Sequence, residues 1–154
     1  MSNLVPPHGA DLLKPLLLPK AERTEEAHRA SRLKQVPLSG REVSDLLMLG
    51  MGAYTPLNGF MGEADWRGCC EHMMLADGVF WPIPITASCT QELGDSISLG
   101  EDVALIDGEI GELLGVLTIE DKYAIDRELE CSQVFRTIDP AHPGVKKVMS
   151  QGPF

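Results

Sequence analysis

One glycine- and proline-rich stretch, residues 50–61 (GMGAYTPLNGFM), limits most strongly how this chain can fold. Glycine adopts backbone conformations that other residues resist, and Pro56 fixes its own backbone angle, so the chain must turn sharply here. The pattern is typical of a tight, partly buried junction between two helices. Its first residues also come close to the dinucleotide-binding fingerprint, but the third glycine is absent and Pro56 stands where the phosphate-binding helix should begin. We therefore do not expect this stretch to bind a nucleotide.

A helix is expected on each side of the stretch. Before it, Ser39 and Glu42 have the spacing of a capping box, in which each side chain bonds the backbone N–H of the other residue. That helix should end at Gly50, which stands where a left-handed C-terminal cap is expected. After the stretch, residues 62–74 predict a second helix. The apolar positions of the two helices are Val43, Leu46, Leu47 and Leu49 in the first, and Ala64, Trp66, Cys69, Cys70 and Met73 in the second.

The chain before these two helices predicts an arm and a further helix. Residues 1–20 hold four prolines around their leucines, which is typical of an extended arm whose leucines dock on a core. Residues 21–33 are rich in helix formers, and Ala27, Ala30 and Leu33 recur at helical spacing on one side. Pro37 should end that segment.

The second half of the chain changes from helical to strand-like patterns. Strands are expected at residues 81–86, 96–99, 103–106 and 113–119, a helix at residues 127–136, and turns at Asp107-Gly108 and at residues 139–144. Two prolines exclude a helix from residues 81–86 and favour an edge strand. The apolar runs at 103–106 and 113–119 suggest strands covered on both faces. Helices therefore precede a strand-rich half, and the sequence predicts an α+β domain with a small barrel-like sheet.

Length and composition suit one globular domain, since the chain has 154 residues, of which 44% are apolar and 23% charged. Its net charge of -10 opposes binding to phosphate backbones, and glutamates interrupt the densest basic stretch, residues 23–34, so we expect no nucleic-acid partner. No apolar run is long enough to span a bilayer, so no membrane partner is expected. Residues 1–7 lack the basic start and apolar core of a secretory signal, which predicts a cytoplasmic location.

The residues that could carry chemistry are scattered along the sequence. Neither the histidines nor the cysteines have the spacing of a metal site, and we expect the cysteines to be reduced and structural and His72 to lie on a helix surface. These residues are His8, His28, His72 and His142, and Cys69, Cys70, Cys89 and Cys131. The acidic clusters at 101–102, 120–121 and 128–130 could form acid–base pairs, but such runs are usually solvated strand ends and helix faces. The residues alone therefore predict no catalytic, cofactor-binding or metal-binding site.

Four short motifs follow one another along the chain. They are Pro7-His8-Gly9; residues 54–61 (YTPLNGFM); residues 75–78 (LADG) with 81–86 (WPIPIT); and residues 134–137 (VFRT) with 142–145 (HPGV). Each motif is weak by itself. Together, in this order and over nearly the whole chain, they resemble the N-terminal domain of ATP sulfurylase (sulfate adenylyltransferase).

The resemblance implies that residues 1–154 form a PUA-like domain with a small β-barrel and flanking helices. In the family, a larger nucleotidyltransferase domain follows and joins ATP and sulfate to give adenosine 5′-phosphosulfate and pyrophosphate in sulfur metabolism. The family's catalytic residues lie in that second domain, in a Gln-x-Arg-Asn segment and an H-x-x-H pair. Neither occurs here, since residues 133–136 (QVFR) have the wrong order. No catalytic residue can be carried over, no cofactor is expected in this chain, and ATP and sulfate remain substrates of the full-length family.

The expected role is therefore that of a scaffold. In the family a glycine-rich strand follows the His-Pro-Gly turn, and this sequence ends before it, so the barrel is expected to lack its last strand and to leave an open edge. We expect the chain to be inactive alone, to contact the catalytic domain of an ATP sulfurylase and to form a homo-oligomer. The alternatives are a free-standing PUA-like module that binds RNA or a nucleotide, and a purely regulatory interaction domain.

Overall fold

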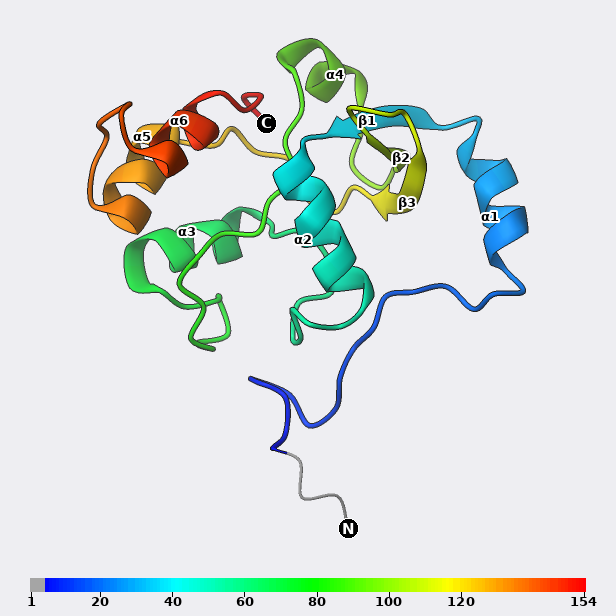
Figure 1. Ribbon diagram of the computed structural model, residues 1–154, viewed down its shortest axis with the longest axis horizontal. Coiled ribbons are helices and arrows are strands. Elements are labelled where there is room, and N and C mark those ends of the chain that lie inside the picture. Colours follow the sequence, from blue (N-terminus) through cyan, green and yellow to red (C-terminus); the bar gives the residue numbers. More distant parts are fainter. Residues whose placement is uncertain (1–4) are drawn as a thin grey trace. The chain divides into compact units, whose positions relative to one another are not determined.

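The computed structural model describes residues 5–154 (Figure 1). The prediction that no secretory signal is present rests partly on residues 1–4, which lie outside the described residues. The chain divides into two compact units. The first contains the residues up to Phe60 together with Val103–Leu117, and the second contains Met61–Asp102 and Thr118–Phe154. Among the described residues, no helix is both long and apolar enough to cross a membrane.

A three-stranded sheet lies in the first unit, with the strands in the order β1-β2-β3. These strands are β1 (Lys34–Leu38), β2 (Asp102–Asp107) and β3 (Leu113–Thr118). β1 runs parallel to β2, with Val36 opposite Leu105, and β2 continues into β3 through the predicted hairpin. The sheet is open and mixed, so the α+β fold is confirmed without a closed barrel.

The two strands of the hairpin differ in how they are covered. Val103, Ala104 and Leu105 are consecutive and fully buried, which confirms that β2 is covered on both faces. β3 is only half-buried along most of its length, so the same prediction is wrong for β3. The reason is its position, because within residues 5–154 β3 is an end strand and pairs with β2 alone.

β1 was not predicted, and Pro37 lies within it rather than at the end of a helix. The helix before it, α1 (Arg23–Ala30), already ends at Ala30, which is buried, while Ala27 is exposed. A proline removes one ladder donor, so a strand tolerates it best at the edge of a sheet. β1 is such an edge strand.

The helix α2 (Gly40–Gly50) confirms the capping box, since the Glu42 carboxylate accepts from the backbone N–H of Ser39 at 2.8 Å. The expected left-handed residue is displaced, because Gly50 is the last helical residue and Gly52 has the positive φ of 80°. The predicted apolar stripe is only partly buried. Leu49 is buried, but Leu47 is 57% exposed, and the other buried positions of the helix are Glu42 and Asp45.

The second unit is largely helical. Its elements are α3 (Glu63–His72), α4 (Gln91–Ser96), α5 (Arg127–Glu130), the π-helical turn η1 (Cys131–Phe135) and α6 (Pro143–Met149). The predicted helices at 62–74 and 127–136 are thus confirmed. Trp66, Cys69 and Cys70 are buried as expected, whereas Ala64 and Met73 are exposed.

Two sequence predictions are wrong in the second unit, and a third is only partly right. Residues 81–86 form no strand, because two prolines leave few ladder donors, and only an isolated bridge between Met74 and Phe80 precedes them. The strand expected at 96–99 does not form, since Ser96 is the last residue of α4 and residues 97–99 have no regular secondary structure. The first turn of α4 is capped by the Thr90 hydroxyl, which accepts from Leu93 N at 3.3 Å. The turn expected at 139–144 is present over residues 139–142, where His142 N donates to the oxygen of Asp139 at 2.9 Å, but Pro143 and Gly144 already belong to α6, which the His142 ring caps.

The core of the second unit contains a buried polar pair. Trp66 of α3 is 1% exposed, and its indole N–H donates to the carboxylate of Glu130, which is 3% exposed, at 2.8 Å. The Tyr123 hydroxyl donates to the backbone oxygen of Met61 at 3.0 Å, and its ring lies 5.9 Å from that of Trp66. These contacts join α3 to α5 and to the segment before α5.

Candidate docking surface

His72 and His142 both lie in the second unit. His72 lies on the surface of α3 with 65% of its side chain exposed, as predicted, and His142 accepts from Val145 N at 3.4 Å as the cap of α6. Among residues 5–154, no three histidine, cysteine, aspartate or glutamate side chains gather in a group that could hold a metal ion. The absence of site residues thus remains a prediction.

The acidic clusters have structural partners within the second unit. Asp121 accepts from the backbone N–H of Glu63 at 2.8 Å and so caps α3, and Asp102 accepts from the Thr118 hydroxyl at 2.6 Å. Glu130 differs from the prediction of a solvated face, because it is buried against Trp66. A sequence cannot show this, since the partner is 64 residues away.

The cysteines are free thiols, and Cys69, Cys70 and Cys131 are buried. Burial raises the pKa of Cys69 from 9.0 to about 12, with a smaller contribution from Asp65. Burial also raises the pKa of Cys70 to about 12, with Glu130 as the next cause. A thiol with such a pKa is protonated at neutral pH and is a poor nucleophile, which agrees with a structural role.

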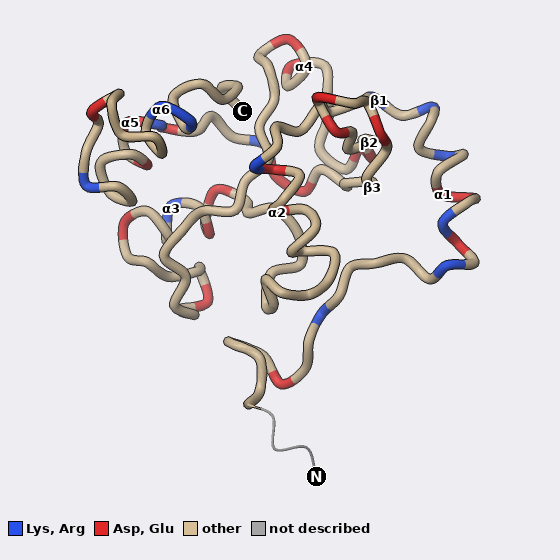
Figure 2. The backbone as a smooth tube through the Cα atoms, viewed as in Figure 1, with Lys and Arg blue, Asp and Glu red and all other residues tan. Residues whose placement is uncertain are grey.

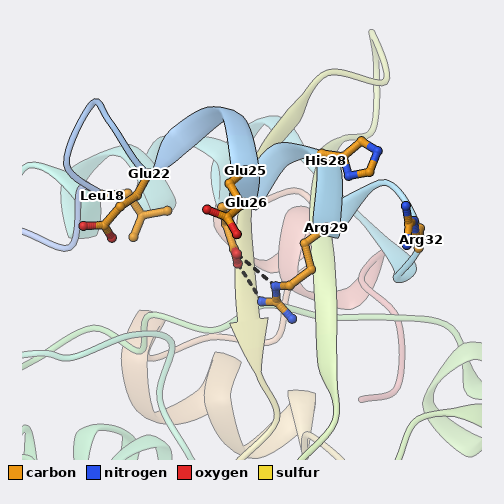
Figure 3. Close-up of a pocket in the computed structure, with 7 residues that line it drawn as sticks. All are labelled: Leu18, Glu22, Glu25, Glu26, His28, Arg29 and Arg32. Carbon is orange, nitrogen blue, oxygen red and sulfur yellow. Dashed lines mark hydrogen bonds and ion pairs between the residues drawn. The ribbon is translucent and has the colours of Figure 1, made fainter.

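A surface hollow of about 400 Å³ lies beside α1 (Figure 3). All of its lining comes from α1 and the residues beside it, namely Leu18, Glu22, Glu25, Glu26, His28, Arg29 and Arg32. Arg29 is already bound by Glu26, with a nitrogen–oxygen distance of 2.6 Å. The opposite charges compensate each other and no second element closes the hollow, so it offers no preformed ligand site.

The feature that stands out in the first unit is an exposed apolar arm. Five of its residues are leucines with exposed fractions between 42% and 78%, and we call them together the leucine arm. They are Leu12, Leu13, Leu16, Leu17 and Leu18. The prediction that these leucines dock on a core is therefore wrong for this chain. Figure 2 shows that the arm carries few charged residues, although the whole chain has a net charge of -10.

Backbone hydrogen bonds hold the leucine arm against the loop at residues 50–61. Leu16 N donates to the oxygen of Gly50 at 3.0 Å, and Lys14 N donates to the hydroxyl of Thr55 at 2.9 Å. Thr55 is 4% exposed, and its hydroxyl in turn donates to the oxygen of Gly52 at 2.7 Å. The backbone of the arm is thus fixed by hydrogen bonds, while its five leucine side chains remain 42–78% exposed.

Gly52 and Tyr54 keep the loop in the shape that holds the arm. A Cβ at Gly52 would lie 3.0 Å from the backbone nitrogen of Pro15, so only glycine allows this close approach. The Tyr54 hydroxyl donates to Asp45 of α2 at 3.1 Å. Burial raises the pKa of Asp45, while the charge of Arg41 and the bond from Tyr54 lower it. The predicted junction between two helices is confirmed, and its role as a clamp for the arm was not predicted.

A sequence signal for this surface was present. Prolines at positions 6, 7, 15 and 19 prevent the arm from forming a helix or from pairing over its length in a sheet. An extended segment of this kind can turn only some of its side chains toward one neighbour. Five leucines within seven residues therefore indicate an exposed apolar surface.

Comparisons with known proteins agree with the resemblance seen in the sequence. The model of a family described as a PUA-like domain matches residues 5–154. The sulfate adenylyltransferase of Chlorobaculum tepidum is 57% identical over 150 residues, which are 97% of this chain and 37% of that protein. The enzyme of Syntrophobacter fumaroxidans is 57% identical over 153 residues, 98% of this chain and 37% of that protein. The chain thus spans little more than a third of the length of these relatives.

A solved structure is also similar. It is described as a hexameric APS kinase from Thiobacillus denitrificans, and it superposes with a TM-score of 0.69 at 36% sequence identity. The match covers 80% of this chain and 24% of that one. Both comparisons therefore align this chain with one part of a much longer protein.

Proposed function

The chain belongs to the PUA-like domain family and is the counterpart of the N-terminal domain of sulfate adenylyltransferases, and we propose that residues 1–154 serve such an enzyme as its structural domain. The reaction of that enzyme joins ATP and sulfate to give adenosine 5′-phosphosulfate and pyrophosphate. In this proposal the chain supplies no catalytic residue, holds no cofactor and is inactive alone. It acts in the cytoplasm, packed on a nucleotidyltransferase domain.

The leucine arm is the observation that carries this proposal. Burying a leucine side chain fully is worth about 1.5–3 kcal/mol, and the five side chains of the arm are roughly half exposed. A body that covers them gains several kcal/mol on this basis. Because the bonds at Leu16 and Lys14 already fix the arm, little conformational entropy is lost on docking.

The occupant that fits the arm is the rest of such an enzyme. This chain matches only 37% of the length of its relative from Chlorobaculum tepidum. The rest of that protein is large enough to cover the arm. The low charge of the arm suits a permanent apolar contact better than a transient one. We also propose that copies of the chain contact each other through a surface other than the leucine arm. The similar solved structure is described as hexameric, which supports such a contact.

Two experiments test the proposal. The purified 154-residue chain should release no pyrophosphate in the presence of ATP and sulfate, and release above the blank would show that it is active alone. A chimera of this chain with the remaining part of the Chlorobaculum tepidum enzyme should release pyrophosphate. In that chimera, the double variant Leu13→Ser/Leu17→Ser should lower the melting temperature by at least 5 °C, whereas it should leave the isolated chain nearly unchanged.

Leu99→Ser is the matched control, because Leu99 is 65% exposed, close to the 63% of Leu17, and belongs to the second unit. It should leave the melting temperature of the chimera unchanged. Equal effects of the arm variant and of Leu99→Ser would show that the arm is not covered in the enzyme.

The acidic charge favours this proposal over a free-standing module that binds RNA. With a net charge of -10 the chain repels phosphate backbones, and the proposal includes no nucleic-acid partner. Binding of a labelled RNA at about 0.15 M salt, weakening steeply as salt rises, would favour the RNA-binding alternative.

A further inference from the structure

An asparagine or aspartate directly before a glycine is prone to a reaction with its own backbone. The chain has three such pairs, which are Asn58-Gly59, Asp77-Gly78 and Asp107-Gly108. The backbone nitrogen of the glycine can attack the side-chain carbonyl carbon of the residue before it and close a succinimide ring. Glycine permits the attack because it has no Cβ to hinder the rotation of the peptide. The reaction therefore needs a glycine N–H and a side chain that are both free to move.

Hydrogen bonds hold both reacting groups of the pair Asp77-Gly78. The glycine N–H donates to the backbone oxygen of Leu75 at 2.9 Å. The aspartate carboxylate accepts from the backbone N–H of Val79 at 3.0 Å. Ring closure would break both of these bonds, so folding should slow the reaction at this pair.

The pair Asp107-Gly108, in the hairpin turn, is held in the same way. The glycine N–H donates to the backbone oxygen of Leu38 at 2.9 Å, and the carboxylate accepts from Glu109 N at 2.8 Å. A Cβ on Gly108 would lie only 2.7 Å from that oxygen of Leu38. The peptide therefore has little room to rotate, and folding should protect this pair as well.

The pair Asn58-Gly59 has neither restraint. Asn58 is exposed and lies in a stretch without helix or strand. Within residues 5–154, neither Asn58 nor the N–H of Gly59 has a hydrogen-bond partner. A Cβ placed on Gly59 would meet no atom beyond its chain neighbours within 4 Å. The attacking nitrogen and its target are thus both free to approach each other.

We propose that Asn58 is a site of spontaneous deamidation in the folded chain. The nitrogen of Gly59 loses its proton and forms a bond to Cγ of Asn58. The bond from Cγ to the side-chain nitrogen breaks, and that nitrogen takes up a proton and leaves as ammonia. Water then opens the ring at either carbonyl and gives aspartate or isoaspartate. Nothing is oxidised or reduced, and the reaction does not depend on the proposed function.

The isoaspartyl product should disturb the anchor at Met61, three residues later. In this product the main chain runs through the former side chain of Asn58 and is longer by a methylene group. Met61 is 6% exposed and is held at both backbone groups. Its N–H donates to the oxygen of Ile85 at 2.8 Å, and its oxygen accepts from the Tyr123 hydroxyl at 3.0 Å. A closely packed anchor tolerates a longer link poorly, so this product should lower the stability of the fold.

Mass spectrometry of proteolytic fragments, taken during incubation of the whole chain at mildly alkaline pH, tests the proposal. Short peptides with the sequence of each pair give the rate without a fold. We expect Asn58 to deamidate in the folded chain within about fivefold of its rate in the peptide, since no hydrogen bond has to break. Asp77 and Asp107 should isomerise at least about tenfold more slowly in the folded chain than in their peptides. The proposal is overturned if folding protects Asn58 as strongly as the two aspartates.

Gly59→Ala is the decisive variant, because its Cβ has open space and Gly59 lies outside the left-handed region of the backbone. It should slow deamidation at least about tenfold and leave the urea midpoint of unfolding unchanged. Deamidation as fast as in the natural chain would refute the attack by the Gly59 nitrogen.

Asn58→Asp is the matched control for the isoaspartyl product, because it supplies the same negative charge on an unaltered main chain. The isoaspartyl form, separated by chromatography, should unfold at a lower urea concentration than Asn58→Asp. Equal urea midpoints would overturn the proposed effect on Met61.

Discussion

Replacing Trp66 by phenylalanine should destabilise the second unit by about 2–4 kcal/mol. The variant removes the indole N–H that donates to Glu130 at 2.8 Å and leaves that carboxylate, only 3% exposed, without this donor. Loss of a hydrogen bond to a buried charged group costs about 1.5–3 kcal/mol, and the smaller ring adds about 1 kcal/mol for the space it leaves. At roughly 2–4 °C per kcal/mol, a loss near the middle of this range lowers the melting temperature by about 6–12 °C.

Urea unfolding followed by far-ultraviolet circular dichroism measures this cost without depending on tryptophan fluorescence. Glu130→Gln should cost less than Trp66→Phe, because the amide oxygen can still accept from the indole although the bond is no longer charge-assisted. Glu128→Gln is the matched control on the same helix, since Glu128 is exposed and should change stability by less than about 0.5 kcal/mol. The reasoning is refuted if Trp66→Phe unfolds at the same urea concentration as the natural chain, or if Glu128→Gln is as costly as Glu130→Gln.

Three further predictions concern the loop, the thiols and the cap. Gly52→Ala should release the leucine arm to limited proteolysis and cost more than Gly78→Ala, because both glycines have positive φ but only Gly52 has backbone atoms within 3.2 Å of the new Cβ. The pKa values of Cys69 and Cys70 are raised from 9.0 to about 12 in the folded chain, so the unfolded chain loses these protons at lower pH. The free energy of unfolding measured in urea should therefore fall as the pH rises from about 9 toward about 12. Glu42→Ala should cost about 1–2 kcal/mol in urea unfolding through loss of the cap of α2, and an unchanged midpoint would show that the cap contributes nothing.

The parts of the fold that were predicted correctly depend on signals that are local in the sequence. The capping spacing of Ser39 and Glu42 places the start of α2, and the turn at Asp107-Gly108 places the hairpin, because each signal acts over a few residues. At the hairpin, the Asp107 carboxylate accepts from the backbone N–H groups of Glu109 and Ile110 at 2.8 and 3.2 Å. Bonds of this kind form in the local chain and need no distant partner.

The missed elements depend on partners that are distant in the sequence. β1 contains a proline and reads as a helix end, and it becomes a strand because β2, nearly 70 residues later, lies parallel to it. In α6, Pro143 was interpreted as a turn residue, although proline is equally suited to the first turn of a helix. The helix is retained because Val145 and Val148 pack on Cys131 of the neighbouring turn. Local chemistry permits both outcomes at these positions, and packing decides between them.

The candidate surface was hard to predict because some charged side chains of this chain are buried and some apolar ones are exposed. Carboxylates of Glu42 and Glu130 lie inside, each with a hydrogen-bond donor, while the leucines of the arm lie outside. A buried carboxylate is tolerated where a donor compensates its desolvation, so the interior positions need no further explanation. No such compensation exists for a leucine in water. The proposal that another body covers the arm accounts for this exposure, and the bonds to Gly50 and Thr55 fix the backbone of the arm in advance of such a contact.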